Sequence, residues 1–410
     1  MERAKYAEKA DAREGGVGDE TTIITPDVYS NAANTKFIPI VAERDDAGMA
    51  LMPSYLKARI YIDLCSEQVY FDGYEKLLRV LHGEPANPKP ALGKKPSHLA
   101  EGATTGSTTL PLLKRAIAAL EQDKRSGLAL AQDHLEAVVE SIAGLRVVMS
   151  GPEPIDDRVA DAIARSKAMR DEVLDLLEIL CRSAPPEKTE PLIHQALEKL
   201  LSACFHQQEG GVFPEAENDA VRFVTMELFL YVVSVLLVRD ELDVLGALLQ
   251  ETFVYREDFG EQKVKKYRAF RFPIASIDED RNRRLRLNKM SLVAELLRER
   301  ADRKSVPFRQ LQEVEFLLFL RLRYEGKTGW YPRTLVYLSD NAPPFPAFLG
   351  LDSPRRAKRL VAILGIGNIE EIRNRFEAVF PDESSRFIRF GPNPWPPSIA
   401  RLMNIDLGES

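Results

Sequence analysis

Basic and aromatic residues are concentrated between residues 263 and 289, the stretch of this sequence best suited to bind an anion. It holds ten lysines and arginines, with Tyr267, Phe270 and Phe272 between them. Guanidinium and ammonium groups bind phosphate oxygens and aromatic rings stack on bases, so the pattern predicts a nucleotide or nucleic-acid site. The arginines at the centre of this predicted anion patch are Arg281, Arg283, Arg284 and Arg286.

The same charges have a simpler interpretation as a solvated protein surface. The acidic run 278–280 and nearby acidic helices supply carboxylates that can pair with them. The whole chain has a net charge of −6, which gives no indication of a polyanionic partner. Further along, Trp330 and Tyr331 are most simply interpreted as residues that pack beneath the helices.

Glycines precede two carboxylates near the N-terminus. Gly15, Gly16 and Gly18 are followed by Asp19 and Glu20. Glycines allow a backbone to approach a ligand or simply to form a loop. Acidic residues in the first turn of a helix are also favoured by the helix dipole. No P-loop lysine and serine follow, so these residues do not indicate a phosphate cradle.

Metal and nucleophile motifs are lacking in the sequence. The five histidines form no HExxH pattern and no Gly-x-Ser-x-Gly elbow occurs, so we predict no metal and no bound cofactor. The three cysteines are few and scattered, which is typical of a reducing compartment and predicts a cytoplasmic protein. The longest apolar run, residues 228–238, is shorter than the roughly 20 residues that span a bilayer, so we expect no membrane segment.

The length of 410 residues predicts two or three domains, and the pattern of strand-like and helical segments predicts an α+β protein. Residues 36–41 and 58–64 are short apolar runs typical of buried parallel strands, and residues 73–82 have helical spacing. We therefore expect a βαβ-type domain over 1–96 and a linker rich in Pro, Gly, Ser and Thr over 97–109. A helical domain over 110–262 and a helical domain with short strands over 263–410 would follow. The short strands are expected at 270–274 and 334–337.

Three motifs in the first hundred residues, in this order, resemble bacterial TIR and SEFIR domains. They are GGVGDE at 15–20, KFIPI at 36–40 and YLKARIYID at 55–63. The resemblance covers less than a quarter of the chain and is carried by the combination of the three motifs. It implies a flavodoxin-like α/β fold with parallel strands and helices on both faces. Residues 36–41 and 58–64 would be the fourth and fifth strands, and residues 73–82 the last helix.

The resemblance also implies a role for Glu20. Catalytic TIR domains use a glutamate on the third helix to cleave the bond between nicotinamide and ribose in NAD, and Glu20 matches that position. A carboxylate at this point can stabilise the oxocarbenium-like ribose that forms as nicotinamide leaves. NAD would be a substrate and not a bound cofactor.

The first three strands of the family have no counterpart in this chain, so we expect a truncated domain that is inactive unless a partner completes it. Two functions follow from the resemblance. One is an effector, for example in bacterial defence against phage, that cleaves NAD when complete and is regulated by its helical remainder. The other is a SEFIR-like adaptor without chemistry. Both imply that the domain associates with its own kind.

Overall fold

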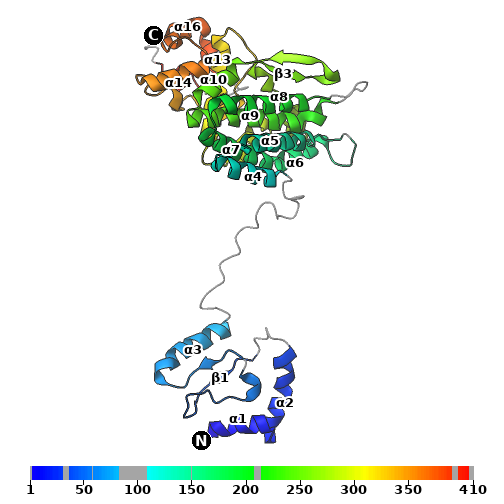
Figure 1. Cartoon of the computed structure of the whole chain (residues 1–410), viewed down its shortest axis with the longest axis vertical. Coiled ribbons are helices and arrows are strands. Elements are labelled where there is room, and N and C mark those ends of the chain that lie inside the picture. Colours follow the sequence, from blue (N-terminus) through cyan, green and yellow to red (C-terminus); the bar gives the residue numbers. More distant parts are fainter. Residues whose placement is uncertain are drawn as a thin grey trace. The chain divides into compact units, whose positions relative to one another are not determined.

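The computed structural model describes residues 2–30, 37–57, 59–82, 109–148, 150–206, 214–389 and 396–405. The chain divides into two compact units, Met1–Pro96 and Ser97–Ser410, which are best followed separately in Figure 1. Helices dominate and the described strands are few and short, as predicted for an α+β chain with a mainly helical remainder. Apart from Thr109, the predicted linker at 97–109 lies outside the described residues.

The N-terminal unit combines helices with one parallel pair of strands (Figure 1). Its elements are α1 (Glu2–Ala12), α2 (Gly15–Ser30), β1 (Ile40–Val41), a 3-10 turn (Ser54–Leu56), β2 (Ile62–Asp63) and α3 (Glu67–His82). Ile40 lies opposite Ile62, and Val41 lies opposite Asp63. Both strands fall where the sequence predicted strands, but each is only two residues long. Each strand has a described partner on one side alone.

The predicted glycine loop is part of a helix. α2 begins at Gly15, so Gly15, Gly16 and Gly18 lie in its first turn and not in a loop before it. Gly18 is buried in the corner between α1 and α2, where an added Cβ would lie 2.4 Å from the carbonyl oxygen of Arg13. This glycine therefore serves the close approach of two segments of this chain, since any larger residue would force them apart.

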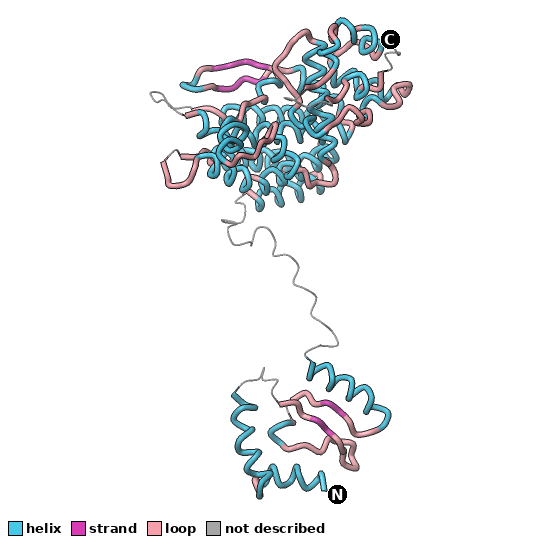
Figure 2. Tube along the Cα trace, turned by 180° about the vertical axis from the view of Figure 1, so that it is seen from behind, coloured by secondary structure: helices cyan, strands magenta, loops and turns pink. Residues whose placement is uncertain are grey.

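The second unit is a stack of helices (Figures 1 and 2). Its first elements are α4 (Leu110–Glu121), α5 (Gly127–Ala143), α6 (Ile155–Arg165), α7 (Lys167–Ser183), α8 (Pro186–Ala203), α9 (Asp219–Arg239) and α10 (Leu242–Gln250). Apolar residues three and four apart give most of them one face for the core. Residues 155–183 form two helices, α6 and α7, which meet at Ser166.

Helix α9 is the centre of this unit. Every residue from Asp219 to Leu237 is buried, because α6, α7, α8 and α13 all pack against it. With the turn before it, this helix is long and apolar enough to cross a membrane, at a mean hydropathy of 2.1. However, 94% of that apolar window is buried inside the unit, as expected for the core helix of a folded domain.

The remainder of the unit mixes short helices and turns with one hairpin. The hairpin pairs β3 (Phe253–Arg256) with β4 (Gln262–Lys265) in antiparallel register. After it come α11 (Asn282–Arg284), α12 (Leu292–Arg300), α13 (Phe308–Tyr324), α14 (Pro354–Leu364), α15 (Glu370–Asn374), α16 (Phe376–Val379) and α17 (Ile399–Leu402). The strands predicted at 270–274 and 334–337 were wrong. A 3-10 turn, Arg333–Tyr337, covers the second stretch, and the first holds only the end of the turn Tyr267–Phe270 before residues 271–274 without regular secondary structure. Pro273 lies inside the first predicted strand and cannot donate to a sheet.

One hydrophobic core joins the two helical domains that we predicted separately. It runs from Val138 on α5 to Met403 after α17 and includes residues on both sides of position 262. Phe229 of α9 stacks on Phe270, with ring centroids 4.2 Å apart. The predicted boundary between 262 and 263 therefore does not separate two folding units, since the rings on either side of it share one core.

Candidate functional site

Glu20 lies on the second turn of α2 with its side chain exposed. Its described partner is the hydroxyl of Tyr6 on α1, which donates to Oε2 at 3.4 Å. Burial and then the carboxylate of Glu20 raise the pKa of Tyr6, so this hydroxyl stays protonated at neutral pH. The arrangement leaves the carboxylate open to solvent, where a cationic ligand can reach it.

The predicted anion patch is neutralised by carboxylates from α6. Arg284 holds Asp156 through Nη2 at 2.6 Å and Asp157 at 2.7 Å. Arg281 also forms an ion pair with Asp157, and the guanidinium of Arg281 lowers the pKa of that carboxyl group. The partners of Arg281 and Arg284 thus come from α6, one of the nearby acidic helices, because the segment folds back onto it. The acidic run 278–280 contributes Asp280, which pairs with Arg283.

The other two arginines of the patch do not add to it. Arg283 lies 3.7 Å from Asp280 and is exposed, and Arg286 is exposed on a turn where its own φ is 52°. The four side chains therefore do not converge on one described ligand position. The interpretation of this stretch as a solvated surface with paired charges therefore fits better than a nucleotide site.

A different basic cleft lies at the end of α13. Its volume is about 550 Å³, within the range of small-molecule sites. Four cationic side chains line it, together with aromatic and apolar residues. They are Arg271, Pro273, Phe319, Leu322, Arg323, Lys327, Thr328, Gly329, Trp330, Tyr331, Arg333, Ser385 and Phe387. We call this the Arg271 cleft.

Three separate segments build the Arg271 cleft: residues 271–273, residues 319–333 and residues 385–387. Helix α13 contributes Arg323, and it ends in a turn where the amide of Lys327 donates to the carbonyl of Leu322 at 2.8 Å. Gly329 then takes a φ of 120°, which a residue with a side chain rarely adopts, and this conformation directs the chain into Trp330. Arg271 arrives from the segment that follows the hairpin, so its neighbours are about 60 residues away in sequence.

Arg271 and Arg333 are neighbours that share one acceptor. Nη1 of Arg271 and Nη2 of Arg333 both donate to the carbonyl oxygen of Phe272, at 3.1 and 2.8 Å. Both side chains are half-buried, and neither forms an ion pair with a described residue. Nε of Arg271 and Nη1 of Arg333 also lack a described hydrogen-bond partner. The two cations are therefore held by neutral oxygens.

The nearest carboxylates are occupied elsewhere. Glu315 on α13 accepts from the amide and the hydroxyl of Thr334, both at 2.7 Å. Asp278 accepts from the hydroxyl of Ser291 at 3.0 Å and from the amide of Val293 at 2.9 Å. Both carboxylates attract the two arginines only from a distance, because their oxygens accept hydrogen bonds from backbone amides and hydroxyls of other segments.

The charge in this cleft persists at neutral pH. Burial and then the adjacent charge of Arg333 lower the pKa of Arg271 to about 10, and burial also lowers the pKa of Arg333. A guanidinium with a pKa near 10 is still protonated at pH 7. The cleft thus presents two adjacent positive charges without a described counter-ion, which is chemically unfavourable unless an anion compensates them.

The aromatic side of the cleft is partly open. Tyr331 is exposed, its ring lies edge-on to Phe319 with centroids 6.4 Å apart, and its hydroxyl donates to the carbonyl of Arg389. Trp330 is almost completely buried behind it. The indole nitrogen of Trp330 has no described acceptor. A flat ligand could stack on the open ring while its anionic end meets the arginines.

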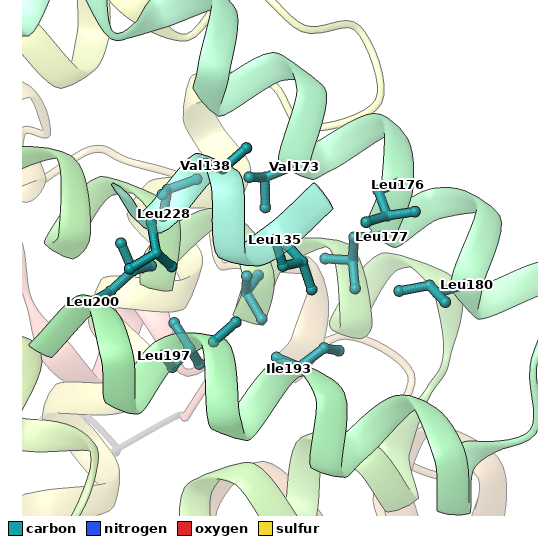
Figure 3. A pocket seen from close by; sticks show the side chains of 13 residues that line it. Leu135, Val138, Val173, Leu176, Leu177, Leu180, Ile193, Leu197, Leu200 and Leu228 are labelled. Carbon is teal, nitrogen blue, oxygen red and sulfur yellow. The ribbon is translucent and has the colours of Figure 1, made fainter. Parts of the chain in front are cut away.

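A second cavity, drawn in Figure 3, is purely apolar. Leucine and valine side chains from α5, α7, α8 and α9 line it, and it holds about 30 Å³. That volume is too small for a cofactor, and the lining offers no polar partner to a water molecule. It is a packing defect between helices and carries no chemistry.

The cysteine and histidine residues do not form a reactive centre in the described part of the chain. No group of three or more potential metal ligands occurs there. Burial raises the pKa of Cys181 and of Cys204 to about 12, so both thiols are unreactive at neutral pH. His194 stacks on Phe253 with centroids 4.5 Å apart, which is a packing role.

The sequence pattern identified part of the Arg271 cleft and missed the rest. Arg271 lies in the predicted basic stretch, whereas Arg323, Lys327 and Arg333 were not chosen and Trp330 was interpreted as packing. A usable signal was the run WYPR at 330–333, which places an arginine beside two large aromatic residues. That Arg333 lies beside Arg271 can be seen only in the folded structure.

Comparisons with known proteins give no further assignment. No family model matches the chain, and neither the curated proteins nor the solved structures yield a match.

Proposed function

We propose that the protein is a signalling effector of the TIR/SEFIR type, in which the N-terminal unit acts by association with its own kind and the helical unit regulates it. The fold of the N-terminal unit is proposed to be the back of a flavodoxin-like sheet. The parallel pairing of β1 with β2 and the helix α3 that follows support this proposal, since they reproduce the order of the last two strands and the last helix.

One observation carries the proposed association: among its described residues, the N-terminal unit exposes more large apolar side chains than it buries. Eleven are exposed, among them Ile60 at 96%, Phe71 at 77% and Ile23 at 74%. The buried hydrophobic residues described in this unit are Ala10, Val41 and Met52. Exposing this many apolar side chains to water is unfavourable, so an assembly that buries them is stabilised by the hydrophobic effect.

The exposed apolar residues are organised along α3. Tyr70, Phe71, Tyr74 and Leu81 fall on one side of the helix at spacings of three, four and seven residues, and we call them the α3 stripe. Tyr70 and Tyr74 stack in parallel with centroids 6.1 Å apart. An aromatic stripe of this kind fits the same stripe on a second copy, because a two-fold contact is self-complementary.

We further propose that Glu20 is the catalytic carboxylate of the assembled form, with NAD as substrate. In this reaction the bond between C1′ of the ribose and the nicotinamide nitrogen breaks, and its electron pair leaves with nicotinamide. Glu20 stabilises the positive charge on the ribose. Water adds to C1′ and loses a proton to solvent, which gives ADP-ribose. The exposure of Glu20 beside the neutral hydroxyl of Tyr6 supports this role.

Energy transfer between two batches of the full chain, labelled with donor and acceptor at the α-amino group, tests the association. Wild type is expected to transfer energy on mixing, and Phe71→Ser/Leu81→Ser to lose that transfer. The matched control, Val148→Ser/Met290→Ser, removes two exposed apolar residues of the helical unit and should behave as wild type. Equal transfer from all three proteins would refute the role of the α3 stripe.

Nicotinamide release by the full chain tests the reaction. Glu20→Gln should abolish release, because the amide cannot stabilise a cationic ribose, while Asp19→Asn, one residue away on the same exposed helix, should retain it. Equal rates for wild type and Glu20→Gln would remove Glu20 from the mechanism and leave the adaptor function. The Asp19 variant separates a specific loss from a general loss of negative charge on α2.

A further inference from the structure

The Arg271 cleft combines features that together define a ligand. It presents two arginines that no described carboxylate neutralises, a solvent-exposed tyrosine and enough volume for a small molecule. From these features we propose that the Arg271 cleft binds a nucleoside monophosphate or a similar phosphorylated aromatic molecule. This inference concerns the helical unit alone and does not depend on the proposed function of the N-terminal unit.

The phosphate would be bound by Arg271 and Arg333. A guanidinium offers five donors in a planar fork, and two adjacent forks match the several oxygens of a phosphate group. In the present arrangement both groups donate to the carbonyl of Phe272, whose oxygen has only two lone pairs. A phosphate would therefore add charge-assisted bonds that this carbonyl cannot supply.

The neighbouring cations contribute in different ways. Arg323 donates to the carbonyl of Val379 at 3.1 Å and lies over the ring of Phe380, so it is positioned by neutral partners like the first two arginines. Lys327 is already paired with Glu325 at 3.0 Å. We therefore propose that the arginines bind the phosphate and that the lysine attracts it only weakly, from the edge of the cleft.

The base would lie on the aromatic side. Tyr331 is the solvent-exposed aromatic residue of the lining, and Phe387 and Pro273 supply further apolar surface around the cleft. Stacking of a base on such a ring contributes about 1 to 3 kcal/mol and is tolerant of base identity. The cleft lacks a described carboxylate or amide side chain that would read one base, so the proposal predicts binding of several nucleotides.

The observations favour a mononucleotide over a nucleic-acid strand. The cationic side chains converge on one cleft of about 550 Å³, whereas a strand needs a groove along which successive phosphates are contacted. The other basic surface that could extend such a groove, around Arg284, is paired with Asp156 and Asp157. A single phosphate group is therefore the better match.

Titration calorimetry of the full chain with AMP, GMP, CMP, UMP, adenosine and inorganic phosphate tests the proposal. The nucleotides should bind at one site per chain, adenosine should not bind, and phosphate should bind at least about tenfold more weakly than AMP. Equal affinity for phosphate and AMP would overturn the proposal that the base stacks on the aromatic side of the cleft. No binding of any nucleotide would overturn the whole. Tighter binding of a short oligonucleotide than of AMP would favour a nucleic-acid surface and overturn the mononucleotide assignment.

Variants locate the site. Arg271→Lys keeps the charge but loses the fork, and should weaken AMP binding about tenfold or more. Tyr331→Ala changes an exposed side chain, so it should fold, and should weaken AMP while leaving phosphate unchanged. Arg284→Gln, in the neutralised patch, should bind AMP as wild type does. Loss of binding in Arg284→Gln with retention in Arg271→Lys and Tyr331→Ala would place the site elsewhere and contradict the proposal.

Discussion

Arg271 and Arg333 donate to one and the same oxygen, the carbonyl of Phe272, although 61 residues separate Arg333 from that carbonyl in the sequence. Two half-buried cations thus lie side by side with neutral acceptors as their described partners. By contrast, the described arginines of the helical unit that are more deeply buried are each paired with a carboxylate; they are Arg170, Arg222, Arg300 and Arg321. Arg300, for example, grips Glu227 with two bonds of 2.7 Å. We interpret the carboxylate-paired Arg300 as a residue that stabilises the fold, and Arg271 and Arg333 as residues that can bind a ligand.

The first prediction compares the two kinds of buried arginine. Arg300→Met leaves Glu227 buried with Arg170 at 3.3 Å as its remaining partner, so it should lower the free energy of unfolding by about 3 kcal/mol. Arg271→Met removes a cation that no described carboxylate pairs, and should change this free energy by less than about 1 kcal/mol. Urea unfolding followed by tryptophan fluorescence measures both. Equal losses would show that Arg271 is a structural residue.

The second prediction concerns pH and the ion pairs of the neutralised patch. Because Arg281 lowers the pKa of Asp157 below its ordinary value of 3.8, the carboxylate stabilises the fold above pH 3.8. That contribution is lost as the pH falls through the lowered pKa. Asp157→Asn should therefore melt below wild type at pH 7, and the gap in melting temperature should close progressively below pH 3.8.

Asp161→Asn is the matched control for this pH dependence. Asp161 is exposed on the same helix α6 and forms no ion pair with a described residue. Its variant should follow the melting curve of wild type at every pH. A gap between Asp157→Asn and wild type that stays constant in acid would contradict the assigned ion pairs.

The third prediction concerns the apolar cavity of Figure 3. A cavity costs about 24 cal/mol for each Å³, so filling its 30 Å³ should gain about 0.7 kcal/mol. Val173→Ile adds one methyl group at the lining and should raise the free energy of unfolding by about that amount. Leu176→Ala enlarges the same cavity and should lower it by about 3 kcal/mol. A loss of stability in Val173→Ile would mean that the helices are already closely packed there.

The helical architecture was predictable because the physics that sets it is local. Apolar residues three and four apart located most helices of the second unit, and the absence of a polar face identified α9 as central. The two strand predictions in the second unit failed because local patterns do not decide there. The segment at 270–274 has strand-forming residues, yet Phe270 stacks on Phe229 in the core and the backbone turns.

The candidate sites were harder to predict than the fold. Charge density pointed to Arg284 and its neighbours, but a sequence cannot show that Asp156 lies against them, 128 residues away. It also cannot show that Glu315 and Asp278 are already occupied by backbone and hydroxyl donors. Whether a basic stretch binds a ligand depends on which carboxylates the fold brings to it, and those are distant in sequence.

The solution mass of the full chain tests the central claim, association through the N-terminal unit, most directly. Light scattering over a wide concentration range should give a mass that rises above that of one chain in wild type. The same measurement on Phe71→Ser/Leu81→Ser should give a single chain throughout. A wild-type protein that remains a single chain at every concentration would contradict the account.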